Sequence, residues 1–562
     1  MWTLAYRHGM RSRVVNLFLA ESQLLDDRAL DFLVSQVDPM AVSRQVLEGV
    51  DSLETVPLVL GLSDVEICLG NAIQRGGSTV VMVPSGRKGD SINVQRLPEG
   101  LAGGHQVQTK ASIADPASLP APVRRIDPPA VRRTPRVPPM PAPTTHMVSS
   151  AKRVEGECSV DILLDITGDS TCSGCINDFS RYFQDRFTRL KRLISHRREM
   201  MGSVPIAAIN NRRGEVKTIG MVMERQSTSK GGVVFEIEDE SGRIKVLSSG
   251  KKEVPTDIVT DEVVGIVGTV NPKGDMVYAE QLVRPDIPIR RRTHMTDHDV
   301  NVAFASDIHV GSNTFLDTQW NRFMDFLNGR LDNGNGTKNI LDTLEVLVVP
   351  GDVVDGIGVF PGQQEELLIS DIYRQYEAMA ELLKEVPDHI EVIMSPGNHD
   401  AVRLAEPQPA LPNDIQKMFA GKVRFVGNPS LIDIEGVKIL TYHGKSIDDF
   451  VTHVQQCTYE DPVTVMKEML KRRHLAPIYG GRTNIAPEAT DHMVIETIPD
   501  IFVTGHVHGT GVEEYRGSLL INASSWQSQT KYQKSMNFVP DPAKVPIVNL
   551  HNMSVKVMDF AT

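Results

Sequence analysis

The sequence predicts a protein of the α/β class (α+β over the whole chain), in which a β-sandwich flanked by helices follows a five-stranded barrel. Three observations predict this fold. Five apolar segments after residue 300 each end in a cluster of polar residues, and five short strand-like segments lie between residues 205 and 288. A proline-rich stretch separates both groups from an N-terminal region with helical periodicity. A length of 562 residues fits three or four domains of about 150 residues each.

The composition narrows the range of functions. Lysine and arginine number 59 against 71 aspartates and glutamates, which gives a net charge of −12. An acidic chain repels phosphates, so generic polyanion binding is excluded, and a nucleic-acid role needs local basic patches or bound metals. Five scattered cysteines exclude a disulfide scaffold, and Cys172 with Cys175 is a lone CxxC pair, short of the four ligands of a structural zinc site. No apolar segment approaches the roughly 20 residues of a membrane span, which predicts a cytoplasmic protein without membrane contact.

Residues 1–83 are predicted to form a small helical domain, because apolar residues such as Leu30 and Leu33 recur with helical spacing. Residues 84–150 follow as a disordered linker, since ten prolines occur between residues 115 and 143 and such a segment buries little apolar surface. The arginines of this linker permit two interpretations, an electrostatic tether for DNA or an extended, solvated spacer. They are Arg124, Arg125, Arg132, Arg133 and Arg136.

Residues 151–204 contain a basic amphipathic helix, predicted over residues 177–201. Phe179, Phe183 and Phe187 recur at every fourth position, which marks one apolar face. Seven lysines and arginines stand against one aspartate between residues 181 and 198. The basic face is either a DNA-binding flank or the solvated side of a helix that packs on a core. The candidate DNA-binding residues are Arg186, Arg189, Lys191 and Arg192.

Residues 205–290 are predicted to form an OB-type barrel, because short strands and glycine turns alternate there. Such barrels often bind single strands through aromatic side chains in a basic groove. Phe235 and Tyr278 are the only aromatic residues of this region, so a structural or interface role stays open beside direct DNA binding. The expected strands cover residues 217–223, 233–237, 244–247, 262–268 and 276–278.

Residues 291–562 carry the candidate chemistry. Their five apolar segments are expected to be strands, and α/β folds gather their sites at the carboxyl ends of strands. The segments cover residues 302–306, 344–349, 390–394, 437–441 and 501–503. The motifs that follow them are DxH, GDxxD, GNHD, a single histidine and GHxH, and their polar residues are Asp307, His309, Asp352, Asp355, Asn398, His399, Asp400, His443, His506 and His508.

These residue types favour a centre of two divalent ions. Carboxylate and imidazole ligands select Mn²⁺, Zn²⁺ or Fe²⁺ over metals that prefer thiolates. Two such ions carry +4, and the carboxylates of Asp307 and Asp352 return −2, so the centre keeps a charge of about +2. A centre of that charge attracts a phosphate ester and lowers the pKa of a bound water.

In this order the motifs resemble the calcineurin-like metallophosphoesterase superfamily. The resemblance implies two metal sites that share Asp352 as a bridge. It implies that His399 protonates the leaving oxygen and is steered by Asp400, with Asp355 supporting the ligands. The other implied ligands are Asp307, His309 and His508 at one metal, and Asn398, His443 and His506 at the second.

Two departures from the Ser/Thr phosphatase branch of the superfamily favour its nuclease-like members. That branch has an arginine directly after the second aspartate of GDxxD, where this chain has Gly356. It also has a glutamate after GNH, where this chain has Asp400.

A barrel that leads into a phosphoesterase domain resembles the B-subunits of replicative DNA polymerases. Residues 165–168, 277–288 and 545–560 resemble the small subunits of archaeal family-D polymerases, and the resemblance extends over residues 155–562. It implies a Mn²⁺-dependent 3′→5′ proofreading exonuclease for single-stranded or mismatched DNA 3′ ends. It also implies a heterodimer with a large catalytic polymerase subunit, and a sliding clamp as a partner through the assembled polymerase. A stand-alone metallophosphoesterase and a non-catalytic scaffold subunit are the alternatives.

Overall fold

The computed structural model describes residues 158–561 except 210–213, 230, 250–254, 332–334 and 536, together with a few residues between 14 and 68. By its contacts the chain divides into two units, residues 1–80 with 157–562 and residues 81–156. The predicted linker and its arginines lie outside the described residues, as does most of the predicted N-terminal domain. Within that domain Leu30 and Val46 are helical and buried, and strands β1 (Leu24–Leu25) and β2 (Val59–Leu60) pair in parallel.

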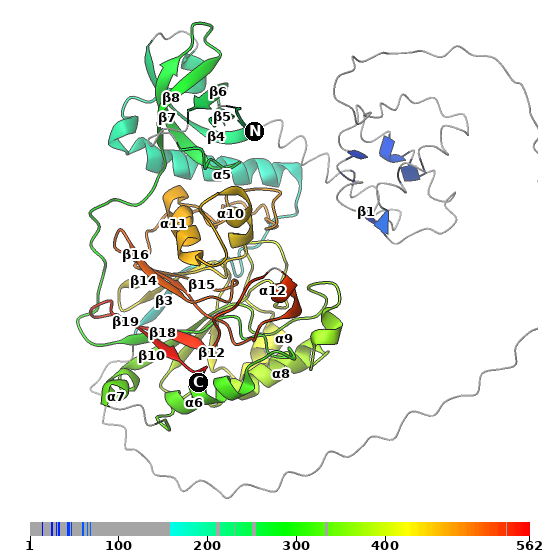
Figure 1. Cartoon of the computed structure of the whole chain (residues 1–562), viewed down its shortest axis with the longest axis vertical. Helices are drawn as coiled ribbons and strands as arrows, with labels where there is room; N and C mark the ends of the chain where they lie inside the picture. Colours follow the sequence, from blue (N-terminus) through cyan, green and yellow to red (C-terminus); the bar gives the residue numbers. More distant parts are fainter. Residues whose placement is uncertain are drawn as a thin grey trace, which may run out of the picture. The chain divides into compact units, whose positions relative to one another are not determined.

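The five strands expected between residues 205 and 290 all form, and they close into one barrel (Figure 1). Alternate side chains, such as those of Phe235 and Ile237, point into a common buried core. Asp239 makes the turn after β5, because its Oδ1 accepts hydrogen bonds from Ser241 N at 2.8 Å and Gly242 N at 3.1 Å. The order around the barrel is β4-β5-β6-β8-β7. The strands are β4 Glu215–Ser227, β5 Val233–Asp239, β6 Gly242–Ser248, β7 Val263–Val270 and β8 Met276–Val283.

The first sheet of the sandwich has six strands in the order β12-β11-β10-β9-β18-β19. Strands β9 to β12 run parallel, and β18 and β19 add an antiparallel edge. β10 is buried at every position, as expected for a parallel strand covered on both faces. The strands are β9 Asn301–Phe304, β10 Leu344–Pro350, β11 Glu391–Ser395, β12 Val423–Phe425, β18 Lys544–Asn549 and β19 Val555–Asp559.

The second sheet also has six strands, in the order β16-β17-β15-β14-β13-β3. Its edge strand β3 lies ahead of the barrel in sequence and pairs antiparallel with β13. The sandwich therefore includes a strand from before the barrel, which the order of the sequence does not predict. The strands are β3 Val160–Leu164, β13 Ser430–Ile434, β14 Val437–Thr441, β15 Ile501–Thr504, β16 Gly511–Tyr515 and β17 Ser518–Asn522.

The two sheets pack face to face and helices cover their outer faces (Figure 1). Phe304 and Val348 of the first sheet share a buried cluster with Ile439 and Val503 of the second. Helices α6 and α8 bury their apolar sides against the first sheet, and α10 and α11 bury theirs against the second. The helices of this part of the chain are α5 Ile176–Ser195, α6 Asp317–Leu327, α7 Asn335–Leu341, α8 Ile372–Leu383, α9 Asn413–Gln416, α10 Ile447–His453, α11 Pro462–Arg472 and α12 Lys531–Ser535.

The basic helix forms as α5, although it ends at Ser195, earlier than expected. Arg186 is fully buried, and its Nε donates to Asp491 Oδ2 at 2.7 Å. The expectation that Arg186 contacts DNA is therefore wrong, because its guanidinium lies inside the protein. Arg189 and Arg192 pair with Glu496, and Lys191 pairs with Glu240 at 3.3 Å.

For these three exposed or partly exposed cations a DNA contact stays a prediction. None of the helices that the structure describes is both long and apolar enough to cross a lipid bilayer.

Candidate metal centre

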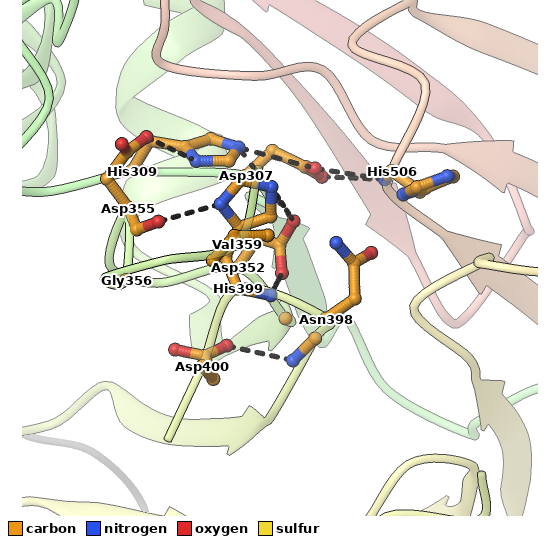
Figure 2. Close-up of polar contacts among 12 residues, drawn as sticks. Asp307, His309, Asp352, Asp355, Gly356, Val359, Asn398, His399, Asp400 and His506 are labelled. Carbon is orange, nitrogen blue, oxygen red and sulfur yellow. Dashed lines mark hydrogen bonds and ion pairs between the residues drawn. The ribbon is translucent and has the colours of Figure 1, made fainter. Parts of the chain in front are cut away.

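The loops after five strands converge at one edge of the sandwich and bring the predicted site residues together (Figure 2). The strands β9, β10 and β11 belong to the first sheet, and β14 and β15 belong to the second. Because neighbouring parallel strands end on the same edge, their loops meet. Most of the converging side chains line a cavity of about 310 Å³, and these are His309, Asp352, Asp355, Asn398, His399, His506 and His508.

The backbone at this edge is unusual. Five of the seven predicted ligands have a positive φ, between 49° and 71°. Such a conformation is uncommon for residues with a side chain, costs roughly 1–3 kcal/mol, and concentrates at functional sites. The sequence gives no signal of it. The five residues are Asp307, His309, Asp352, His506 and His508.

Next to the ligands there is room only for glycine, because a side chain would clash with neighbouring atoms. A Cβ on Gly505 would overlap Ser306 Oγ and Asp307 Oδ2, and a Cβ on Gly397 would lie 2.6 Å from Asp352 N. The glycines of the motifs therefore let two loops approach each other closely at the ligands.

The first group of potential ligands consists of Asp307, His309 and His508, whose ligand atoms all lie within 4.8 Å of one another. His508 Nε2 lies 3.4 Å from Asp307 Oδ1 and 3.2 Å from His309 Nε2. Asp355 orients the ring of His309, because its Oδ1 lies 3.1 Å from His309 Nδ1. A carboxylate in that position fixes the ring and leaves Nε2 directed at the group.

Of the two other groups, one consists of His309, Asp355 and His399 and so shares His309 with the first, and the second separate group consists of Asp352, His443 and His506. His443 Nε2 lies 3.2 Å from Asp352 Oδ2 and 3.1 Å from Asn398 Oδ1. Asp352 Oδ2 also lies 3.9 Å from His309 Nε2. Asp352 therefore stands between the two groups and lies close to a histidine of each.

The electrostatics of the centre favour the binding of cations. Burial raises the pKa of Asp352, but His443 and His399 outweigh burial and hold that pKa well below its usual range. Burial lowers the pKa of His309, but Asp307 and Asp355 raise it to about 10. For His443 the effect of Asp352 likewise outweighs burial, and the pKa rises to about 9. The carboxylate of Asp352 thus stays ionised at neutral pH and draws cations to itself.

This donor set fits a pair of divalent ions. It offers carboxylate oxygens, imidazole nitrogens and one amide oxygen that lie close together in groups, and it contains no thiolate. Asp307, His309 and His508 would hold one ion, and Asn398, His443 and His506 the other, with Asp352 between them. The groups of potential ligands found among the described residues do not include Cys172 or Cys175, and the thiol of Cys172 donates to Glu488 Oε1 at 3.2 Å.

His399 lies beside the ligands, but a different residue holds it than expected. Its Nδ1 lies 2.7 Å from the backbone oxygen of Asp355, and its Nε2 lies 4.0 Å from Asp352 Oδ2. Asp400 does not bind the ring. Its carboxylate accepts hydrogen bonds from Gly397 N at 2.8 Å and from the hydroxyl of Tyr376 at 3.0 Å. The expectation that Asp400 steers His399 directly is therefore wrong, because Asp400 instead fixes the GNHD loop.

Several residues of the centre escaped the sequence reasoning, because no motif contains them. Asp448 of α10 lies 3.5 Å from His506 Nε2 and 2.8 Å from Lys445 Nζ. Burial raises the pKa of Asp448, but His506 and Lys445 hold it well below its usual range. Gln533 of α12 lies 2.9 Å from His508 Nδ1. These contacts orient two of the histidines from outside the motifs.

Comparison with known proteins assigns a class to this combination of barrel, sandwich and site. Residues 302–510 match the family of the B subunits of DNA polymerase alpha/epsilon. The chain is 44% identical over 398 residues to the DNA polymerase II small subunit of Archaeoglobus fulgidus, covering 70% of this chain and 80% of that protein. It is 43% identical over 399 residues to the corresponding protein of Methanocaldococcus jannaschii, covering 70% of this chain and 67% of that one.

By class, the protein is thus a small subunit of a DNA polymerase. More particularly, the chain belongs to the family of the archaeal DNA polymerase II small subunits. Among solved structures, an archaeal phosphodiesterase covers 46% of this chain and 99% of its own, at 12% identity and a TM-score of 0.23. The family assignment rests on the sequence relatives alone.

Proposed function

We propose that this chain is the nuclease subunit of a two-subunit DNA polymerase and removes nucleotides from the 3′ ends of single-stranded or mismatched DNA. The observation that carries the proposal is the ligand set, with Asp352 between two groups of potential ligands, most of which line one cavity. The names of the relatives, small subunits of DNA polymerase II, support DNA as the substrate and a large catalytic subunit as the partner. The two metals are proposed to be Mn²⁺, with Zn²⁺ or Fe²⁺ as alternatives.

When bound, two divalent ions would offset the charge of a phosphodiester and lower the pKa of a water beside it. The residues of the chain do the rest. Because a backbone oxygen can only accept a hydrogen bond, His399 Nδ1 carries a proton and donates a hydrogen bond to Asp355 O. Nε2 then faces the side of Asp352 and the cavity. When Nε2 is protonated as well, His399 can give that second proton to the 3′-oxygen that leaves when the terminal nucleotide is released, and the ring returns to its neutral form with the proton on Nδ1.

The experiment that tests this function is a metal-dependent exonuclease assay on matched and mismatched 3′ ends. The full chain is assayed with Mn²⁺ and with a chelator, alone and in complex with its large subunit. We expect Asp352→Ala to abolish cleavage and to reduce bound Mn²⁺, because it removes the bridging ligand. We expect His399→Ala to abolish cleavage and to leave bound Mn²⁺ nearly unchanged, because His399 gives a proton and holds no metal.

Matched controls come from exposed residues of the same types. Asp388 has a fully exposed side chain, and His298 is exposed, so Asp388→Ala and His298→Ala should retain cleavage and metal content. Full activity in both Asp352→Ala and His399→Ala would sink the proposal. Metal binding by the wild type without hydrolysis would favour a scaffold subunit, and turnover of small phosphodiesters far above that of DNA would favour a stand-alone phosphoesterase.

A further inference from the structure

The cavity over the metal centre carries an aromatic group that the phosphoester chemistry does not use. Four of the twenty lining residues are aromatic, namely Phe360, Tyr459, Tyr532 and Phe538, in a chain whose aromatic content is 5%. Tyr532 of α12 is 64% exposed. The ring centroid of Phe360 lies 6.4 Å from that of His399. One exposed and three partly exposed aromatic side chains in the lining of this cavity indicate a binding surface for an apolar part of the substrate.

The charges around the cavity argue against a groove that follows a phosphate backbone. The lining includes four carboxylates, those of Asp352, Asp355, Glu366 and Asp448, and among these lining residues Lys445 is the only lysine or arginine. Lys445 is itself paired with Asp448 at 2.8 Å. A strand that enters therefore finds little cationic support for phosphates other than the one at the metals. Its affinity must come from the bases, and stacking on aromatic rings supplies that without regard to sequence.

The position of Tyr532 is fixed relative to the metal centre. Gln533, the next residue along α12, lies 2.9 Å from His508 Nδ1. Lys531 pairs with Glu366 at 3.5 Å and so joins α12 to the 3₁₀ helix Gln363–Glu366, whose Glu366 also lines the cavity. Phe538 N donates to Gln533 O at 2.9 Å. Tyr532 and Phe538 are thus linked through Gln533 to His508, a predicted metal ligand, and can hold a base at a set distance from the reacting phosphate.

We propose that Tyr532, together with Phe360, forms a stacking platform for the unpaired bases at the 3′ end of the DNA strand. This inference rests on the proposed nuclease function and names the part of the substrate that gives it affinity. A base offers its face to a protein ring only when it has left the duplex, and every base has such a face. The platform therefore selects frayed over paired ends and accepts any of the four bases.

The test combines a substitution of Tyr532 with removal of the base that it is proposed to contact. The full chain in complex with its large subunit is assayed with Mn²⁺ on a single-stranded oligonucleotide. It is also assayed on the same oligonucleotide with an abasic residue at the terminal or the penultimate position. Loss of one base–aromatic contact should raise KM about 5- to 150-fold. We expect that rise for Tyr532→Ala on the normal strand and for the wild type on one of the abasic strands. For Tyr532→Ala, KM should rise little further when that abasic strand replaces the normal one.

Controls separate stacking from a general disturbance of the site. Tyr532→Phe keeps the ring and should restore KM to within about threefold of wild type, since the stacking is retained. Tyr373 on α8 is 49% exposed and does not line the cavity, so Tyr373→Ala should behave as wild type. Equal losses for Tyr532→Ala on the normal and both abasic strands, or an unchanged KM, would overturn the platform while leaving the nuclease function standing. A wild type that cleaves no oligonucleotide would overturn both.

Discussion

Replacing Arg186 by methionine should destabilise the protein, and the size of the effect follows from the contacts of the side chain. Arg186 is fully buried in α5 and binds Asp491 at 2.7 Å, Pro477 O at 2.7 Å and the hydroxyl of Tyr182 at 2.9 Å. Removing one member of a buried ion pair costs about 3–5 kcal/mol, because the partner stays behind without a countercharge. Methionine retains most of the apolar stem, so the loss reports the charge and its hydrogen bonds.

The assay is the thermal midpoint of the full chain. An unfolding entropy of about 2.1 cal/mol/K per residue over roughly 400 folded residues gives about 0.8 kcal/mol/K. The expected fall in Tm is then about 4–6 °C. Arg186→Met combined with Asp491→Leu should recover part of the loss, because no unpaired buried charge remains.

Lys191→Met is the matched control, since Lys191 lies on the same helix and its side chain is 39% exposed. It should change the free energy of unfolding by no more than about 0.5 kcal/mol. The reasoning is refuted if Arg186→Met keeps the wild-type Tm and instead weakens DNA binding as a surface cation would.

Three further predictions concern the fold and the centre. Burial and Arg186 lower the pKa of His474 from 6.5 to about 4, so the unfolded chain binds this proton more readily. The associated stability is therefore complete above pH 6.5 and lost as the pH falls towards 4, and His474→Gln should flatten Tm against pH in that window. Gly505→Ala should weaken metal binding at least about tenfold by displacing Asp307, whereas Gly509→Ala, whose Cβ would meet nothing closer than 3.9 Å, should not; metal analysis decides. Asp448→Asn should weaken metal binding about 10- to 100-fold by releasing His506, as measured by titration with Mn²⁺, and unchanged affinity would exclude that role.

The fold was largely predictable because its signals are local. Each apolar segment after residue 300 became a strand, and the polar residue directly after it was bound to lie at a strand end. Asp307 and Asp352 follow β9 and β10 within a few residues, so their meeting required only that these two strands be parallel neighbours. His443 follows β14 of the second sheet, so its approach to them depends on how the two sheets pack. The barrel strands were likewise predictable, because each is a short segment in which apolar and polar residues alternate.

The parts that were not predictable depend on contacts between residues far apart in sequence. A count of charges cannot distinguish a solvated arginine from a buried one, and the partner that buries Arg186 lies 305 residues away. Asp448 and Gln533 reach the histidines from α10 and α12, where nothing in the local pattern marks them. The role of Asp400 was misjudged for the same reason, since its carboxylate bonds to Tyr376 of α8 rather than to the adjacent His399.

Under the proposed nuclease function, the distribution of charge couples metal binding to DNA binding. The chain carries a net charge of −12, and the cavity itself is lined by four carboxylates against Lys445. Without metals such a cavity repels a phosphodiester. Two divalent ions reverse the local sign at the one point where a phosphate must sit and leave the surroundings acidic. By linkage, whatever metal binding adds to the affinity for DNA, DNA adds to the affinity for metal. The acidic walls then act as a filter: a strand gains by placing one phosphate at the centre, and gains nothing by laying its backbone along the rest of the cavity.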